Sequence, residues 1–327
     1  MAFTDASTGS ITGRSWDFGD GTSSTLQSPS HTYKTAGTYT VQLTVTGPGG
    51  STTATKTGYI TVAPALVEVG ELSLNSLWRR VGFRQTFVDP IVVATPLRTN
   101  DPTPATVRIR NIGPTGFDIR IQPWDYLSNT HGLETVSYLA MERGPHVLGT
   151  GIRVEAGRLA INETSTQSFT QVRFKQSFVA VPVVVASVTS VNETDAVITR
   201  EKGVTSTSCK VRLQEQCANV QSHATETIDY IAWEPSAGSV DGFTFEVHTT
   251  PAAVTNQVYT IRFLQHFLNI SMFLGAMQTN NGGYPATLRW ANESPLAVDI
   301  EVQEEASCSH SLTSPAEVVG YMAFTYP

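Results

Sequence analysis

The sequence is poor in cysteine, in charge and in clustered basic residues, and each shortage excludes a class of protein. It has three cysteines and no CxxC or Cys/His spacing, which argues against a disulfide framework and a structural zinc site. Charged residues make up 15 %, the 21 Lys and Arg are scattered and the net charge is −7. Nucleic acid and anionic membranes are therefore not expected partners. No apolar run approaches the ~20 residues of a membrane span, so membrane insertion is not expected.

Thr, Ser, Val and Gly are abundant instead, and few segments have a helical pattern. This composition is typical of β-sandwiches with uncharged polar faces. No signal peptide is recognisable, which is consistent with a fragment of a longer chain. No Gly-rich phosphate loop follows a strand to open a helix, and no catalytic triad or carboxylate pair stands in a recognisable motif. We expect a non-enzymatic, all-β protein without cofactors.

The first 63 residues have the pattern of a small sandwich. "WDFGDG" (16–21) is a tight turn, "HTY" (31–33) leads into a strand, and "GTYTVQLTV" (37–45) alternates apolar and polar residues. These stretches resemble the PKD domain, an immunoglobulin-like sandwich, with its first strand missing. The resemblance implies a spacer or interaction module in an extracellular or virion-surface protein. We expect Asp17 and Asp20 to cap the turn rather than bind calcium, because further carboxylates are lacking nearby.

One line of sequence recurs three times after the "APA" linker (63–65). It reads "HGLETVSYLAME" (131–142), "HATETIDYIAWE" (223–234) and "SPAEVVGYMAFT" (314–325). Phe pairs recur with it, in "FRQTF" (83–87), "FKQSF" (174–178) and "FLQHF" (263–267). The period of about 90 residues predicts three copies of one antiparallel sandwich, at 66–146, 147–236 and 237–327. Because the shared residues are apolar or lie on alternating strands, we interpret the repeated line as framework.

The repeated glutamates share a strand face with apolar residues and therefore need a buried partner. They are Glu134, Glu226 and Glu317. A column of arginines at similar spacing offers that partner, namely Arg110, Arg200 and Arg289. Two hypotheses follow: each Arg–Glu pair braces its own copy, or the arginines are free to meet a ligand.

The three copies resemble the H-type lectin fold, a six-stranded sandwich. The stretches that carry this are "VGFRQTFVDPIVVAT" (81–95), "GPTGFDIRIQPWDY" (113–126) and "TVSYLAM" (135–141). The resemblance implies binding of N-acetylgalactosamine-type sugars through Arg110, Trp124 and Asp125 of copy 1. A Trp can stack on a sugar while Asp and Arg bond its hydroxyl groups. Copies 2 and 3 lack the Trp–polar pair, and Trp124 has the alternative role of packing against a neighbouring domain.

The remaining reactive residues predict framework roles. His131 and His223 each stand three residues before the repeated Glu, but Ser314 replaces them in copy 3, so we expect hydrogen-bonded histidines and no metal. Cys217 and Cys308 occupy equivalent positions, and a bridge between them would require the copies to meet around a threefold axis. We expect three free, buried thiols, with Cys209 as the third.

Two functions fit these observations. The first is an adhesion module that binds glycans or cell-surface glycoconjugates, multivalent through its three copies. The second is a structural component such as a stalk, filament or virion protein, self-associating as a homotrimer or filament. Accessory domains of an enzyme are a third class if the chain is a fragment. The expected location is extracellular or at the cell surface, alternatively at a virion surface. The copies would form either an internal pseudo-trimer or a row.

Overall fold

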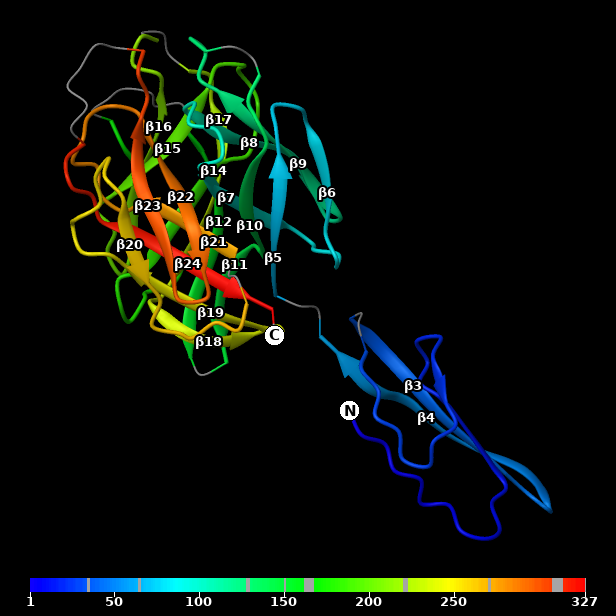
Figure 1. Ribbon diagram of the computed structural model, residues 1–327. Helices are drawn as coiled ribbons and strands as arrows, with labels where there is room; N and C mark the ends of the chain where they lie inside the picture. The colour runs from blue at the N-terminus through cyan, green and yellow to red at the C-terminus, as the bar shows by residue number, and fades with distance from the viewer. Residues whose placement is uncertain are drawn as a thin grey trace. The chain divides into compact units, whose positions relative to one another are not determined.

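The computed structural model describes residues 1–33, 36–63, 66–127, 130–149, 151–161, 168–219, 223–269, 272–307 and 314–326. Every regular element in these ranges is a β-strand, which confirms the all-β prediction (Figure 1). The chain divides into two compact units, Met1–Ala65 and Leu66–Pro327. Each unit is described by itself below.

The N-terminal unit is a four-stranded antiparallel sheet in the order β2-β1-β3-β4. Its strands are β1 (Gly13–Asp17), β2 (Ser23–Ser24), β3 (Gly37–Gly47) and β4 (Gly50–Val62). Trp16 on β1 stands opposite Leu43 on β3. The buried core consists of Phe3, Trp16, Phe18, Val41 and Ile60.

The turn after β1 is held by its two aspartates. Asp17 accepts a hydrogen bond from the Gly19 amide at 2.8 Å, and Asp20 accepts one from the Thr22 amide at 3.1 Å. Gly19 has a φ of +79°, and a Cβ there would lie 2.4 Å from the carbonyl oxygen of Thr40. Only glycine fits such a position. Both carboxylates therefore cap the turn, as predicted.

In the described part of residues 66–327, each of three copies has six strands in equivalent order. Copy 1 has β5 (Val67–Leu74), β6 (Arg79–Gly82), β7 (Pro90–Arg98), β8 (Ala105–Gly113), β9 (Gly116–Pro123) and β10 (Glu134–Glu142). Copy 2 has β12 (Ile152–Ile161), β13 (Thr170–Arg173), β14 (Val183–Val188), β15 (Val197–Lys202), β16 (Ser208–Glu215) and β17 (Glu226–Trp233). Copy 3 has β19 (Phe243–Thr249), β20 (Tyr259–Arg262), β21 (Met272–Met277), β22 (Ala286–Ser294), β23 (Ala297–Glu304) and β24 (Val319–Thr325).

Two further strands precede copies 2 and 3. They are β11 (Gly144–Leu148), which pairs with β12, and β18 (Ser236–Val240), which pairs with β19. The predicted boundaries at 146/147 and 236/237 fall inside these two strands. The exact positions of the boundaries stay predictions.

Each copy is a sandwich of an inner and an outer sheet. In copy 2 the inner sheet has the order β11-β12-β17-β14 and the outer sheet the order β13-β16-β15. Copies 1 and 3 have the equivalent strands, but the inner strands of copy 1 and the outer strands of copy 3 join in one six-stranded sheet, β20-β23-β22-β7-β10-β5. The recurring Phe pairs lie between the sheets in edge-to-face contact, with ring centroids 4.9, 5.1 and 5.2 Å apart. Such contacts add to the burial of apolar area that holds each sandwich closed.

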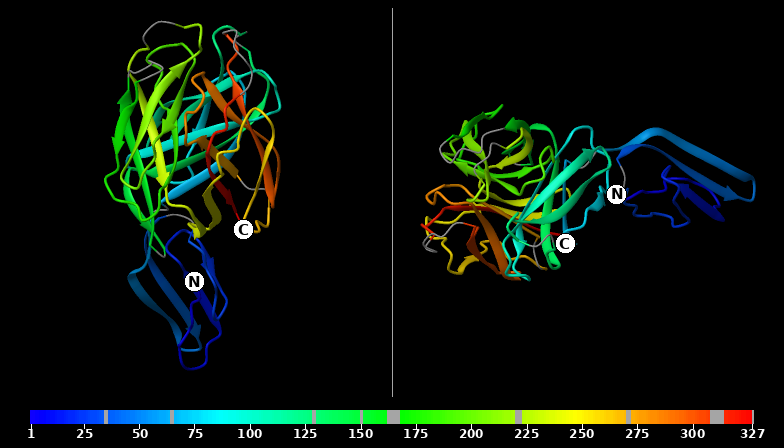
Figure 2. Two further views of the ribbon diagram at one scale, coloured as in Figure 1. Left: turned by 90° about the vertical axis from the view of Figure 1, so that its left-hand side faces the viewer. Right: turned by 90° about the horizontal axis from the view of Figure 1, so that it is seen from above.

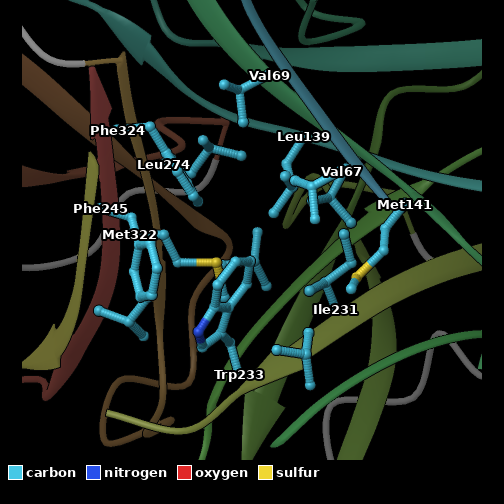
Figure 3. Close-up of a cluster of buried hydrophobic side chains, with 14 of the residues drawn as sticks. Val67, Val69, Leu139, Met141, Ile231, Trp233, Phe245, Leu274, Met322 and Phe324 are labelled. Carbon is cyan, nitrogen blue, oxygen red and sulfur yellow. The ribbon is translucent and has the colours of Figure 1, made fainter. Parts of the chain in front are cut away.

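A shared hydrophobic core joins the three inner sheets (Figure 3). It contains Val69 and Leu139 of copy 1, Ile231 and Trp233 of copy 2, and Phe324 of copy 3, all buried. The inner sheets are therefore buried on both faces, one against their own outer sheet and one against the other copies. This explains the unbroken apolar runs "DPIVVA" and "VPVVVA", since strands buried on both faces do not alternate.

The copies close a ring in the order 1, 2, 3, and Figure 2 shows them as cyan, green and orange groups of strands. The exposed edges of the inner sheets are capped by side chains of another copy. The Val92 amide donates to Asp229 at 2.9 Å, the Val184 amide to Gln278 at 2.9 Å and the Phe273 amide to Ser137 at 3.1 Å. At its far end β7 also pairs in parallel with β22 of copy 3, through Leu97 and Arg98 opposite Arg289 and Trp290. The arrangement is the internal pseudo-trimer, and the alternative of a row is wrong.

Candidate functional site

Three buried Arg–Glu pairs connect the copies around the ring. Arg108 of copy 1 donates to Glu226 of copy 2 at 2.9 Å, and Arg200 of copy 2 donates to Glu317 of copy 3 at 3.4 Å. Arg289 of copy 3 donates to Glu134 of copy 1 and completes the cycle. All six side chains are at most 3 % exposed. The hypothesis that each pair braces its own copy is wrong, because every pair joins two copies.

The predicted arginine column is wrong in copy 1, because the buried arginine that pairs with a ring glutamate is Arg108 and not Arg110. Arg108 stands opposite Arg120 in the outer sheet of copy 1, as Arg200 stands opposite Arg212 in copy 2. Residues 108 and 110 lie on the same face of one strand, so alternation alone could not distinguish them. Arg110 lies near the surface instead, 3.6 Å from Asp118.

The ring glutamates are fully occupied by framework contacts. Glu226 accepts hydrogen bonds from Ser190 and from the Asn192 amide, and Glu317 accepts equivalent bonds from Thr279 and the Asn281 amide. Burial alone would raise the pKa of Glu226, but hydrogen bonds to His223 and Ser190 outweigh it and lower the pKa to about 2. These carboxylates order the loops beside them and leave no oxygen for a substrate.

The tyrosines of the repeated line also have framework roles. Tyr138 donates to Glu68 at 2.9 Å, Tyr230 to Glu155 at 2.8 Å and Tyr321 to Glu246 at 2.6 Å. The other oxygen of each glutamate accepts an amide of the loop inside the Phe pair, for example Arg84 at 2.8 Å. Burial raises the pKa of all three tyrosine hydroxyls. The recurring Glu–Tyr line therefore closes each sandwich.

Trp124 and Asp125 lie at the contact between copies 1 and 2. Trp124 is 1 % exposed and packs against Ala196 and Ile198 of copy 2. The carboxylate of Asp125 accepts a hydrogen bond from the Ala196 amide at 3.0 Å. The Trp124 ring has no free face for a sugar, so the proposed stacking at this residue is wrong. Trp124 instead packs against a neighbouring part of the protein, which was its alternative predicted role.

A different aromatic residue of copy 1 lies at the surface beside two arginines. Trp78 is half-buried and directly precedes β6. The guanidinium of Arg110 lies 4.0 Å from the Trp78 ring centroid, and that of Arg120 lies 4.8 Å from it. The three side chains combine an aromatic face with donors that a ligand could use.

Copy 2 repeats this group and copy 3 does not. Phe169 has Lys202 at 3.9 Å and Arg212 at 4.7 Å from its ring centroid. The positions in copy 3 hold Val258, Ala291 and Glu301. Trp78, Phe169 and Val258 each stand five residues before the first Phe of their copy, a regularity that the sequence contains. We call the group of Trp78, Arg110 and Arg120 the aromatic–cation site.

The cysteines differ from the sequence expectation. Cys209 is free and buried, and burial raises the pKa of its thiol. Cys217 is disulfide-bonded, so the expectation of three free thiols is wrong. Cys308 lies outside the described residues.

Both histidines before the repeated line are buried and contact its glutamate, as expected. His131 Nε2 lies 2.9 Å from Glu134, and His223 Nε2 lies 3.3 Å from Glu226. Burial would lower the pKa of His223, but hydrogen bonds to Glu215 and Glu226 raise it to about 9. In the described residues, Glu193, Glu215 and His223 form a group whose ligand atoms lie within 4.8 Å of one another.

Glu201 makes stability depend on pH in copy 2. It is 2 % exposed, its Oε1 has no hydrogen-bond partner, and burial raises its pKa from 4.5 to about 7. Because the folded pKa exceeds the unfolded value, the wild type loses stability as pH rises from 4.5 through 7. Glu201→Gln should remove this loss and gain about 2–3 kcal/mol at pH 8 relative to pH 4.5. Urea denaturation across this range measures it, and parallel curves for both proteins would contradict it.

The fold defines a protein of two parts, an immunoglobulin-like domain and a closed ring of three β-sandwiches. The family model of the PKD domain matches residues 1–62, and the N-terminal unit belongs to that family. The chain is 30 % identical over 258 residues to Halomucin of Haloquadratum walsbyi. The aligned region covers 76 % of this chain and 3 % of Halomucin. It thus spans a small part of that protein's length.

No solved structure matches the chain. Among the described residues, no helix has the length and apolarity needed to cross a membrane. The resemblance of residues 66–327 to H-type lectins stays a prediction.

Proposed function

We propose that the chain is a non-catalytic module of an extracellular or surface protein and that it binds carbohydrate through the aromatic–cation site. The PKD domain and the similarity to Halomucin support the location. The ring of buried ion pairs supports a rigid, non-catalytic framework, because the charged residues of the repeated line are used in holding the copies together.

The observation that carries carbohydrate binding is the contact of the half-buried Trp78 ring with two arginines, Arg110 and Arg120. An aromatic ring can stack on the apolar face of a sugar, and a guanidinium can bond hydroxyl groups or a carboxylate in a bidentate manner. Arg80 adds a further cation on this face, with its side chain 50 % exposed and 3.4 Å from Asp118. The excess of positive charge favours a glycan with carboxylate or sulfate groups over a neutral galactose-type sugar.

Copy 2 gives the chain a second and weaker site of the same kind. Phe169 offers a smaller ring than Trp78, and Lys202 is a point charge that cannot make a planar bidentate contact. Two sites on one rigid ring can bind one polymer together, which raises the apparent affinity without new contacts. This is adhesion through avidity.

Trp78→Ala should reduce binding to acidic glycans at least tenfold on an array probed with the intact chain. Val258→Ala is the matched control, because Val258 is 65 % exposed at the equivalent position in copy 3, where no cations flank it. Arg120→Gln should weaken binding and its salt dependence together, since it removes one charge from the site. Equal binding by wild type and Trp78→Ala would overturn the proposal.

A self-associating structural role is the second candidate, and the charge of the outer sheets favours it. Copies 1 and 2 carry Arg120 and Arg212 on this face, whereas copy 3 carries Glu301 at the equivalent position. Oppositely charged faces on one ring can attract each other between chains. Light scattering at low and high salt separates the two functions: salt-sensitive oligomers without glycan binding would support the structural role.

A further inference from the structure

We propose that Glu193, Glu215 and His223 form a binding site for one divalent transition-metal cation where copy 2 meets copy 1. Glu193 lies in the loop after β14, Glu215 ends β16, and His223 precedes β17. One ligand atom of each residue lies within 4.8 Å of the other two. A cation placed among them could reach all three with small side-chain movements.

The histidine has the environment of a metal ligand. Its Nδ1 atom faces Glu215 and lies 3.6 Å from Glu193, while Nε2 lies 3.3 Å from Glu226. Metal-bound histidines donate their second ring N–H to a carboxylate, which fixes the tautomer and the ring orientation. Glu226 can supply that acceptor, and Arg108 in turn holds Glu226 at 2.9 Å. Nδ1, which is hydrogen-bonded to Glu215 in the structure, is then the atom that would bind a cation in place of its proton.

A second observation points to a ligand that is not protein. Glu215 is 6 % exposed, and its Oε2 atom is buried without a hydrogen-bond partner. A buried carboxylate oxygen without a partner is costly, and a bound cation would satisfy it. A cation that binds Nδ1 displaces its proton, so Glu193, Glu215 and Glu226 then face a neutral imidazole and one permanent cation, Arg108. A divalent cation balances the two remaining negative charges.

The other copies show that the fold does not need this set of residues. The amides of Asn100, Asn192 and Asn281 all donate to the ring glutamate of their copy, which fixes the equivalent positions. At the positions of Glu193, Glu215 and His223, copy 1 has Asp101, Pro123 and His131. At the same three positions copy 3 has Gly282, Glu304 and Ser314. The complete set of one imidazole and two carboxylates occurs in copy 2 alone among the three, although all three copies share the same ring contacts.

The donor set favours zinc or manganese over calcium. An imidazole nitrogen suits first-row transition metals, whereas calcium prefers six or more oxygen ligands. Glu193 is 31 % exposed, which gives the cation a route from solvent and leaves coordination positions for water. The site would add to the contact between copies 1 and 2.

Zinc titration by calorimetry on the intact chain, after removal of bound metal with a chelator, tests the proposal. We expect one zinc ion per chain, weaker binding of calcium, and at least about a tenfold loss of zinc affinity in Glu193→Gln. Asp101→Asn is the matched control at the equivalent position of copy 1 and should bind zinc as the wild type does. Glu193 is chosen because it is the most exposed of the three ligands.

Thermal unfolding followed by circular dichroism distinguishes loss of the site from loss of the fold. Zinc should raise the midpoint of the wild type and of Asp101→Asn, and should leave that of Glu193→Gln unchanged. Glu215→Gln serves as a second ligand variant. No zinc binding by the folded wild type, or wild-type affinity in both ligand variants, would overturn the proposal.

Discussion

Replacing Arg289 by methionine should lower the free energy of unfolding of residues 66–327 by about 3–5 kcal/mol. The Arg289 side chain is fully buried and donates to Glu134 of copy 1. It also donates to the carbonyl oxygens of Arg98 at 3.1 Å and Asp101 at 2.9 Å. Methionine keeps the apolar volume but leaves a buried carboxylate and two carbonyl groups without their cation. Urea denaturation followed by circular dichroism measures the loss.

The control is an ion pair of the same type at the surface. Arg80→Met breaks the contact with Asp118, in which the Arg80 side chain is 50 % exposed, and should cost less than about 1 kcal/mol. Glu134→Gln in the Arg289→Met background should restore part of the loss, because it removes the uncompensated charge. Equal effects of Arg289→Met and Arg80→Met would show that the ring pairs do not hold the copies together.

The strands and the repeat were predictable because they depend on local pattern. Alternation in "TYTVQLTV" places Tyr39, Val41 and Leu43 in or against the core, and the Phe pairs mark the same point in each copy. The ring was not predictable in the same way. Nothing within one copy states which copy its arginine will meet, and Arg108 and Arg110 share a strand face. That choice is made by contacts between residues more than a hundred positions apart, such as Arg289 and Glu134.

The predicted site failed for a related reason. Trp124 has the residue type and position of a sugar-stacking side chain, but copy 2 covers it, and burial by another copy leaves no local signal. Trp78 was missed although a signal existed. An aromatic residue precedes the second strand in copies 1 and 2, and basic residues follow at matching positions on two neighbouring strands. The aromatic–cation site becomes visible in the sequence when the copies are aligned by strand register, with Arg108 of β8 placed opposite Arg200.

Trp233→Ala should cost about 3–5 kcal/mol and should loosen all three copies together. Trp233 is fully buried in the shared core, 5.0 Å from Phe245 and 5.7 Å from Phe324 between ring centroids (Figure 3). Met141, Trp233 and Phe324 stand seven residues after the ring glutamates of their copies. All three unlike side chains belong to the shared core. Three sheets fixed by ion pairs cannot move inward to fill the cavity that alanine leaves.

Trp233→Phe separates packing from the indole nitrogen. The Nε1 atom of Trp233 is buried without a hydrogen-bond partner, so phenylalanine removes that cost while keeping most of the ring volume. We expect a loss of less than about 1.5 kcal/mol for Trp233→Phe. Denaturant unfolding in one transition for the wild type, with a lower midpoint for Trp233→Ala, is the expected result. If the core is shared, hydrogen-exchange protection should fall in all three copies of Trp233→Ala. Loss of protection in copy 2 alone, with wild-type protection in copies 1 and 3, would contradict a single shared core.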